Sequence, residues 1–273
     1  MTKNLWSVAA VLLLALAGSF AAMAEGTPIV VATHSVIGEF VQIVGDDLVD
    51  VVTIIPSGFC PAHYDLSPRD YAALLEADVI FYSGLEPWVE ELISGSVAEG
   101  TVIKLPSVWN TPPAAVGQVE AIASHLAERF PASADTFAAN AASYIDDLNE
   151  LGTSLLEKAG GLDVASVPVV CMQWQAGFVG WLGFDVAVTY GRPEELSVRD
   201  LVELAEQGLE AGAQLVIDNL QSGIEFGGKL AREVGAVHVV LSNFPGALPN
   251  TATVVDLLTR NAEAMFTAIE PIE

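Results

Sequence analysis

Short apolar runs alternate with stretches of helical period along the first third of the chain. An unbroken apolar run bounded by turn residues is typical of a strand buried in a parallel sheet. Apolar positions three and four residues apart indicate a helix that covers such a sheet. This alternation predicts right-handed crossovers and an α/β fold. The predicted strands are 28–33, 49–55 and 79–82, and the predicted helices are 37–44, 67–76 and 85–92.

The second half of the chain repeats this order of signals. The apolar pair Val30-Val31 precedes Phe40-Val41, as Val169-Val170 precedes Phe178-Val179. Two Ser-x-Arg-Asp segments, beginning at Ser67 and Ser197, each open a helix that leads to a further apolar run. Matches in the same order predict two similar parallel-sheet lobes. The later predicted strands are 215–217 and 237–241.

One long helix is predicted between the lobes, over residues 134–158. Its apolar residues form a single stripe, Ser133 can cap its start, and Gly160-Gly161 ends it. A helix of this length spans roughly 35 Å, enough to join two lobes rigidly. We therefore expect a first lobe at 27–132, a connecting helix at 133–160 and a second lobe at 161–273, with a ligand cleft between the lobes.

Composition supports a folded protein and narrows its partners. Apolar residues make up 52% of the 273 residues and charged residues 16%, so a sizeable core is expected. The chain has 35 acidic and 10 basic residues, a formal net charge of −25. Such a surface repels nucleic acid and anionic lipid. We interpret it chiefly as an aid to solubility in a salty medium.

Residues 1–24 have the pattern of a secretory signal peptide. Lys3 precedes an apolar segment, and Ala22-Met23-Ala24 is a small-x-small cleavage site. The expected product is an exported protein, extracellular or periplasmic, that begins near Glu25. An uncleaved segment that keeps the protein at the membrane is the alternative, because the apolar segment is only somewhat short for a span.

Candidate ligands follow the predicted strands, where parallel sheets bind their guests. Cys60 and His63 lie on a turn of the first lobe, and Cys171 and Met172 end a strand of the second. Thiolate, imidazole and thioether groups suit Zn²⁺ or Cu⁺, so these four residues are the predicted metal ligands. Further cleft-lining candidates are His34, Gln173, Asp218, Asn219, Ser242 and Asn243.

Other interpretations of these residues stay open. Cys60 and Cys171 could form a disulfide between the lobes, or be inert buried thiols. His125 and His238 are assigned to structure. The segment from Gly223 to Lys229 fits a phosphate-binding loop except that Leu230 replaces its Ser or Thr, so a glycine-rich helix start is preferred.

From about Pro28 to Asn261 the chain resembles the metal-binding solute receptors of ABC importers, the zinc and manganese group (cluster A-I). The resemblance implies two α/β lobes joined by one rigid helix, with a metal ion between them. The segments that carry it are Val30-Val31-Ala32-Thr33, Pro56-x-Gly58, Tyr64-Asp65 with Ser67-Pro68, Ala77-Asp78-Val79, Gly84-Leu85-Glu86-Pro87-Trp88 and Asp256 through Asn261.

The ligand positions of that family hold other residues in this chain. By the resemblance, the three family histidines fall on Ala62, Ser107 and Met172, and the acidic ligand falls on Ser242 or Asn243. His63 lies one residue beyond the first position, and Cys60 stands where an aspartate precedes it. The resemblance therefore implies a site rebuilt around Cys60, His63, Cys171 and Met172, or a different guest.

The resulting hypothesis is an exported, monomeric receptor that catalyses nothing and delivers a transition-metal ion to an ABC permease and its ATPase. Zinc is the first choice, copper(I) is the second, and manganese is disfavoured because it prefers oxygen ligands. The alternatives are a receptor for a non-metal ligand or a metal chelate or corrinoid, and an adhesion or interaction protein locked by a disulfide. A metal-dependent hydrolase ranks last, because no general base stands beside the thiols.

Overall fold

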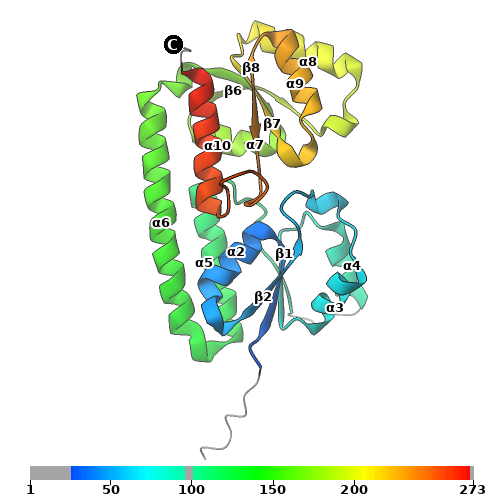
Figure 1. Ribbon diagram of the computed structural model, residues 1–273, viewed down its shortest axis with the longest axis vertical. Helices are drawn as coiled ribbons and strands as arrows, with labels where there is room; N and C mark the ends of the chain where they lie inside the picture. Colours follow the sequence, from blue (N-terminus) through cyan, green and yellow to red (C-terminus); the bar gives the residue numbers. More distant parts are fainter. Residues whose placement is uncertain (1–25, 96–100, 271–273) are drawn as a thin grey trace, which may run out of the picture.

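The computed structural model describes residues 26–95 and 101–270, which form two α/β lobes (Figure 1). Each lobe is built on a four-stranded parallel sheet, ordered β2-β1-β3-β4 in the first and β6-β5-β7-β8 in the second. The equivalent strand orders confirm the predicted repeat. The strands are β1 Ile29–His34, β2 Asp50–Ile55, β3 Val79–Tyr82, β4 Val102–Lys104, β5 Pro168–Met172, β6 Asp185–Tyr190, β7 Leu215–Asn219 and β8 Val237–Leu241.

The second strand in each order, β1 or β5, is hydrogen-bonded to a strand on both sides, and β1 is the apolar run that the sequence predicts as a buried strand. In β1, Val31 pairs with Val52 of β2 on one side and Ile80 of β3 on the other. In β5, Val170 pairs with Val188 and Val216 in the same way. Helices cover both faces of these sheets, so neither face of the strand needs polar residues.

The helices that cover the sheets begin where the sequence provides caps. Ser67, Ser197 and Thr253 each accept a hydrogen bond from the amide of an aspartate three residues on, whose carboxylate bonds back to the cap amide. The α-helices are α2 Ser35–Gly45, α3 Pro68–Glu76, α4 Pro87–Gly95, α5 Pro112–Arg129, α6 Ala134–Gly161, α7 Gln173–Trp181, α8 Val198–Glu210, α9 Glu225–Val234 and α10 Val254–Ile269.

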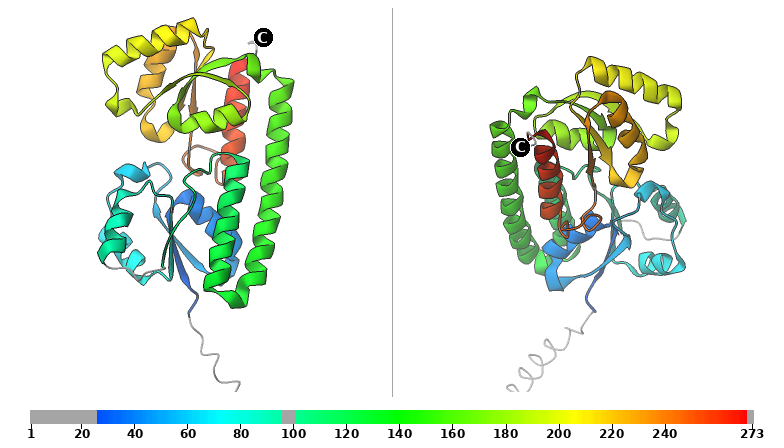
Figure 2. Two further views of the ribbon diagram at one scale, coloured as in Figure 1. Left: turned by 180° about the vertical axis from the view of Figure 1, so that it is seen from behind. Right: turned by 45° about the horizontal axis from the view of Figure 1, so that its top comes forward.

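The predicted connecting helix is α6, which runs along both lobes beside α5 and α10 (Figures 1 and 2). Its buried residues include most of the predicted stripe, among them Phe137, Tyr144 and Leu148. They belong to one hydrophobic core that extends from Phe40 in the first lobe to Phe178 in the second. The lobes are thus joined by shared packing as well as by the chain.

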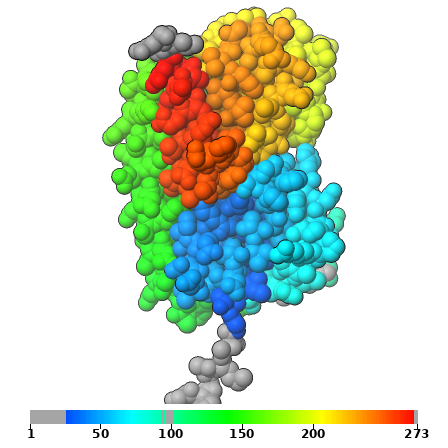
Figure 3. All heavy atoms as spheres, in the orientation of Figure 1, coloured from blue at the N-terminus to red at the C-terminus, as the bar shows by residue number. Residues whose placement is uncertain are grey.

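A partly buried carboxylate of α2 is hydrogen-bonded to two other helices. Glu39 of α2 accepts hydrogen bonds from the Tyr144 hydroxyl of α6 (3.0 Å) and from the Val254 amide that begins α10 (2.8 Å). In Figure 3 the red and orange end of the chain lies against the green long helix and the blue first lobe. Burial raises the pKa of Glu39 to about 7, against the opposing effect of its hydrogen bonds.

The predicted signal peptide, residues 1–24, lies outside the described residues. Among the described helices, none combines the length and the apolar character that crossing a bilayer requires. The lobe boundaries at 132, 160 and 161 stay predictions, while the two sheets fall on either side of them.

Glu39→Gln should change how stability depends on pH. Between the ordinary glutamate pKa of 4.5 and about 7, folded Glu39 holds a proton that the unfolded chain has released, so its contribution to stability falls as pH rises. The variant keeps a carbonyl oxygen for Val254 and Tyr144 without that charge. We expect its free energy of unfolding, relative to wild type, to rise from pH 5 to pH 8 in urea titrations at fixed salt.

Glu150→Gln on the exposed side of α6 is the matched control, because it removes one negative charge without a buried partner. The interpretation fails if the difference between Glu39→Gln and wild type is the same at both pH values after subtracting this control.

Candidate functional site

A cavity of about 910 Å³ lies between the lobes, at the carboxyl ends of their strands. From the first lobe it is lined by the turn after β2 and by the segment after β4. From the second it is lined by residues that follow β5, β6, β7 and β8. The polar and aromatic residues of its wall include Cys60, His63, Ser107, Trp109, Asn110, Gln173, Trp174, Arg192, Asn219, Gln221, Ser222, Asn243 and Phe244.

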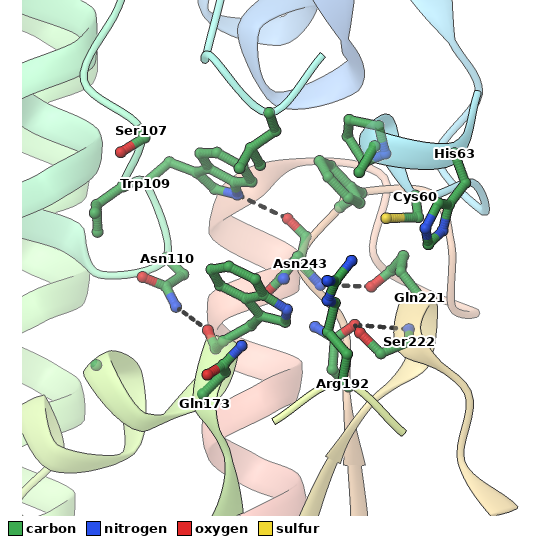
Figure 4. A pocket seen from close by; sticks show the side chains of 18 of the residues that line it. Cys60, His63, Ser107, Trp109, Asn110, Gln173, Arg192, Gln221, Ser222 and Asn243 are labelled. Atoms are coloured by element: carbon green, nitrogen blue, oxygen red, sulfur yellow. Dashed lines mark hydrogen bonds between the residues drawn. The ribbon is translucent and has the colours of Figure 1, made fainter. Parts of the chain in front are cut away.

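Cys60 and His63 stand on one tight turn at the end of β2. The Phe59 amide bonds to the Pro56 carbonyl, and the His63 amide to the Cys60 carbonyl at 3.1 Å, which closes the short 3-10 helix η2 (Pro61–His63). Both side chains line the cavity and lie next to one another in Figure 4. Within the described residues neither has a hydrogen-bond partner, so a thiol and an imidazole are available to a guest.

Three hydrogen bonds connect the lobes around the cavity. The indole nitrogen of Trp109 donates to the Asn243 carbonyl at 2.9 Å, and the Asn110 amide donates to the Trp174 carbonyl at 3.0 Å (Figure 4). The third runs from the Gln221 amide to the carbonyl of Ser57, at 3.4 Å. These bonds add to the shared core in holding the lobes together.

The amide side chains of the second lobe hold one another in place. Gln221 accepts from the Asn243 backbone amide at 3.1 Å and donates to the Ser242 hydroxyl at 2.9 Å. Gln175 donates to the Asn243 side-chain oxygen at 2.8 Å. These hydrogen bonds therefore hold the side chains of this wall in position before a guest binds. Of the predicted cleft residues, Gln173, Asn219 and Asn243 line the cavity, whereas Ser242 lies behind Gln221.

Cys171 and Met172 do not reach the cavity. They are adjacent on β5, so their side chains point to opposite faces of the sheet, and each joins a different hydrophobic cluster. The Met172 sulfur accepts from the Trp174 amide at the start of α7. Burial and the nearby Asp218 raise the pKa of the Cys171 thiol. The structure brings together Cys60 and His63 but leaves Cys171 and Met172 in packed interior.

The disulfide alternative is wrong. Both cysteines are free, with Cys60 partly exposed at the cavity and Cys171 fully buried. A disulfide-locked interaction protein therefore has no basis in this structure.

His34 and Asp218, two further predicted cleft residues, are also buried behind the wall. His34 is 1% exposed and lies against Trp109 and Phe244, with ring centroids 4.7 and 5.2 Å away. Burial lowers its pKa to about 4, so its imidazole is neutral. Asp218 accepts from Tyr190 and pairs with His238 at 2.7 Å, which agrees with a structural role for His238.

Three charged side chains of the second lobe also line the cavity. Arg192 pairs with Glu195 and lies 3.9 Å from Glu194. These carboxylates are already partnered by a cation. Among the described residues, no group of three or more His, Cys, Asp and Glu side chains is placed to hold a metal ion.

Trp109, Asn110, Arg192 and Gln221 are wall residues that the sequence analysis missed. The rule that guests bind after parallel strands would have found Trp109, Asn110 and Arg192, had the strands before them been recognised, whereas Gln221 follows a strand that was predicted. Trp109 and Asn110 follow the three-residue β4, Arg192 follows β6, and Gln221 follows β7 by two residues. Strands β4 and β6 were not predicted.

The family ligand positions inferred from the resemblance likewise divide into residues that line the cavity and residues that are buried behind it. Ala62, Ser107 and Asn243 line the cavity, whereas Met172 and Ser242 lie beneath its surface. These positions therefore lie around the same cavity, but none of the residues at them has an imidazole or carboxylate side chain.

Comparison with known proteins gives one family match that covers most of the chain. Residues 30–268 match the family described as "ZnuA: Zinc-uptake complex component A periplasmic". Among solved structures, the manganese-bound periplasmic metal binding protein of Candidatus Liberibacter asiaticus has a TM-score of 0.78 and 18% identity. The similarity covers 89% of this chain and 100% of that one, and it shows the same fold.

Curated relatives match over a shorter range. The manganese-binding lipoprotein MntA of Halalkalibacterium halodurans is 28% identical over 45% of this chain and 46% of its own. The iron-binding protein YfeA of Yersinia pestis is 29% identical over 51% of this chain and 54% of its own. The match thus spans about half the length of these relatives.

Trp109→Phe should lower stability, because it leaves the partly buried Asn243 carbonyl without its donor while keeping an aromatic ring. We expect a loss of about 1–3 kcal/mol in the free energy of unfolding, measured by urea denaturation. Trp174→Phe is the matched control: its side chain is 45% exposed and, within the described residues, its ring makes no hydrogen bond. Equal losses in the two variants would contradict a role for this bond.

Proposed function

Because the chain belongs to the ZnuA family of periplasmic zinc-uptake components, we propose that it is an exported solute-binding receptor for a transition metal. It takes up the metal between its lobes and delivers it to an ABC permease driven by its ATPase. The family describes a component of an uptake complex, so no catalytic step is assigned to the cavity.

The observation that carries this proposal is the pairing of Cys60 with His63 on the wall of the interlobe cavity. Both are unpartnered, both stand at the carboxyl end of β2, and both present soft donor atoms to the same space. By contrast, Cys171 is fully buried, and the partly buried His238 is paired with Asp218.

Zinc is the metal that these donors favour. Sulfur and nitrogen ligands suit Zn²⁺, whereas manganese prefers oxygen, although relatives of this chain carry the names manganese-binding and iron-binding. Copper(I) would suit the thiol, but the relatives described above are named for manganese and iron.

We expect the two lobes to keep a fixed arrangement when the guest binds, rather than to close about a hinge. Since one core extends through α6 into both lobes, a guest would enter a largely preformed space. The permease and the ATPase are proposed from the transport role alone. A permease gene and an ATPase gene adjacent to this one would support that role.

Protein purified gently from its native host should contain about one equivalent of transition metal, mainly zinc, by elemental analysis. The double variant Cys60→Ser, His63→Ala should retain less than about a tenth of that amount, because it removes the soft donors. His125→Ala on α5, away from the cavity, is the control and should keep its metal. Metal-free wild type, or equal metal content in the double variant, would refute this assignment.

A further inference from the structure

The donors in the cavity are too few for a bare metal ion. A protein site for zinc supplies about three or four ligands. Here Cys60 and His63 supply two, from a single turn, while Glu194 and Glu195 are associated with Arg192. The described residues hold no cluster of three candidate ligands. A guest that coordinates only through this turn must bring its remaining ligands with it.

The volume leads to the same conclusion. A cavity of about 910 Å³ is far larger than one ion needs, and lies within the roughly 300–1,000 Å³ typical of sites for organic ligands. The bonds that cross between the lobes and the shared core maintain this volume, so closure onto a bare ion would require them to break. The space fits a metal surrounded by organic atoms.

The wall has the chemistry of an organic binding site. Trp174, which is 45% exposed, presents an aromatic surface to the cavity beside the largely buried rings of Trp109 and Phe244, which suits a flat or apolar guest. Between them stand side-chain amides, which suit carboxamide, carbonyl or hydroxyl groups on its rim. The amide residues on this wall are Asn110, Gln173, Asn219, Gln221 and Asn243.

The side chain of Asn219 indicates that the guest carries hydrogen-bond acceptors. Its side-chain oxygen accepts from the Ser222 amide at 3.1 Å, and its nitrogen is buried without a hydrogen-bond partner. A buried unpaired donor is costly, and a guest oxygen would satisfy it. A metal cation cannot, since an N–H donor repels positive charge.

We infer that the guest of this cavity is a transition metal already held in an organic chelate, and that Cys60 or His63 fills a coordination position the chelate leaves open. The inference rests on the proposed receptor function and narrows its substrate class. The chelate carries oxygen acceptors on its rim and contacts the aromatic wall. Residues of both lobes contact its organic part, and Cys60 or His63 of the first lobe binds its metal.

Binding of defined probes tests this inference. The probes are zinc chloride, the zinc–iminodiacetate complex, metal-free iminodiacetate, and aquocobinamide, a cobalt macrocycle with peripheral carboxamides and an exchangeable axial position. Affinities come from Trp109 and Trp174 fluorescence and from calorimetry. We expect at least one complex to bind about tenfold or more tightly than zinc chloride, with a shift of the visible bands if it is cobinamide.

Two variants separate the parts of the site. Cys60→Ser, His63→Ala should abolish the band shift and weaken binding of the complex, with His125→Ala unchanged. Asn219→Asp keeps the acceptor for Ser222 but replaces the unpaired donor, and should weaken the same complex about tenfold or more. Asn149→Asp, an exposed change of the same kind on α6, is its control.

Each other outcome overturns the inference in a distinguishable way. If zinc chloride binds as tightly as the complexes, the guest is a bare ion and the receptor function stands. If metal-free iminodiacetate matches its zinc complex, coordination is not involved. If no probe binds and the native protein contains no metal, the proposed function fails as well.

Discussion

The shared hydrophobic core is the constraint on which the rest of the molecule depends. Buried residues of α5, α6 and α10 extend the packing of the first sheet into that of the second. Moving one lobe against the other would therefore expose apolar surface, at about 25 cal/mol for each Å². The shared packing therefore favours a largely preformed cavity whose walls are set by the fold.

Much of the fold was predictable, because its signals are local and repeated. Buried parallel strands appear as apolar runs, capping boxes mark Ser67 and Ser197, and the apolar stripe of α6 continues over about seven turns with Gly152 as its one glycine before the end. The strands that escaped prediction had weak signals for a physical reason. β4 has three residues, and β6 alternates exposed and partly buried positions at the edge of its sheet.

The candidate site was predictable only in part, because position along a strand does not determine which face a side chain occupies. Cys60 and His63 were found since they stand on a turn, free of the sheet. Cys171 and Met172 precede the end of β5 by at most one residue, and the two faces there are both covered by helices. The first residue beyond the strand, Gln173, is the one that lines the cavity.

Cys60 and His63 belong to the same short turn, and this arrangement affects how fast a guest can leave. A guest coordinated from one side only needs a single ligand exchange to leave, whereas one clamped by ligands on both lobes needs the lobes to part. The residence time would then depend on how readily one sulfur or nitrogen bond exchanges, together with the contacts that the cavity wall makes with the chelate. A competing donor offered by the next protein in the route could take the cargo while the scaffold stays closed.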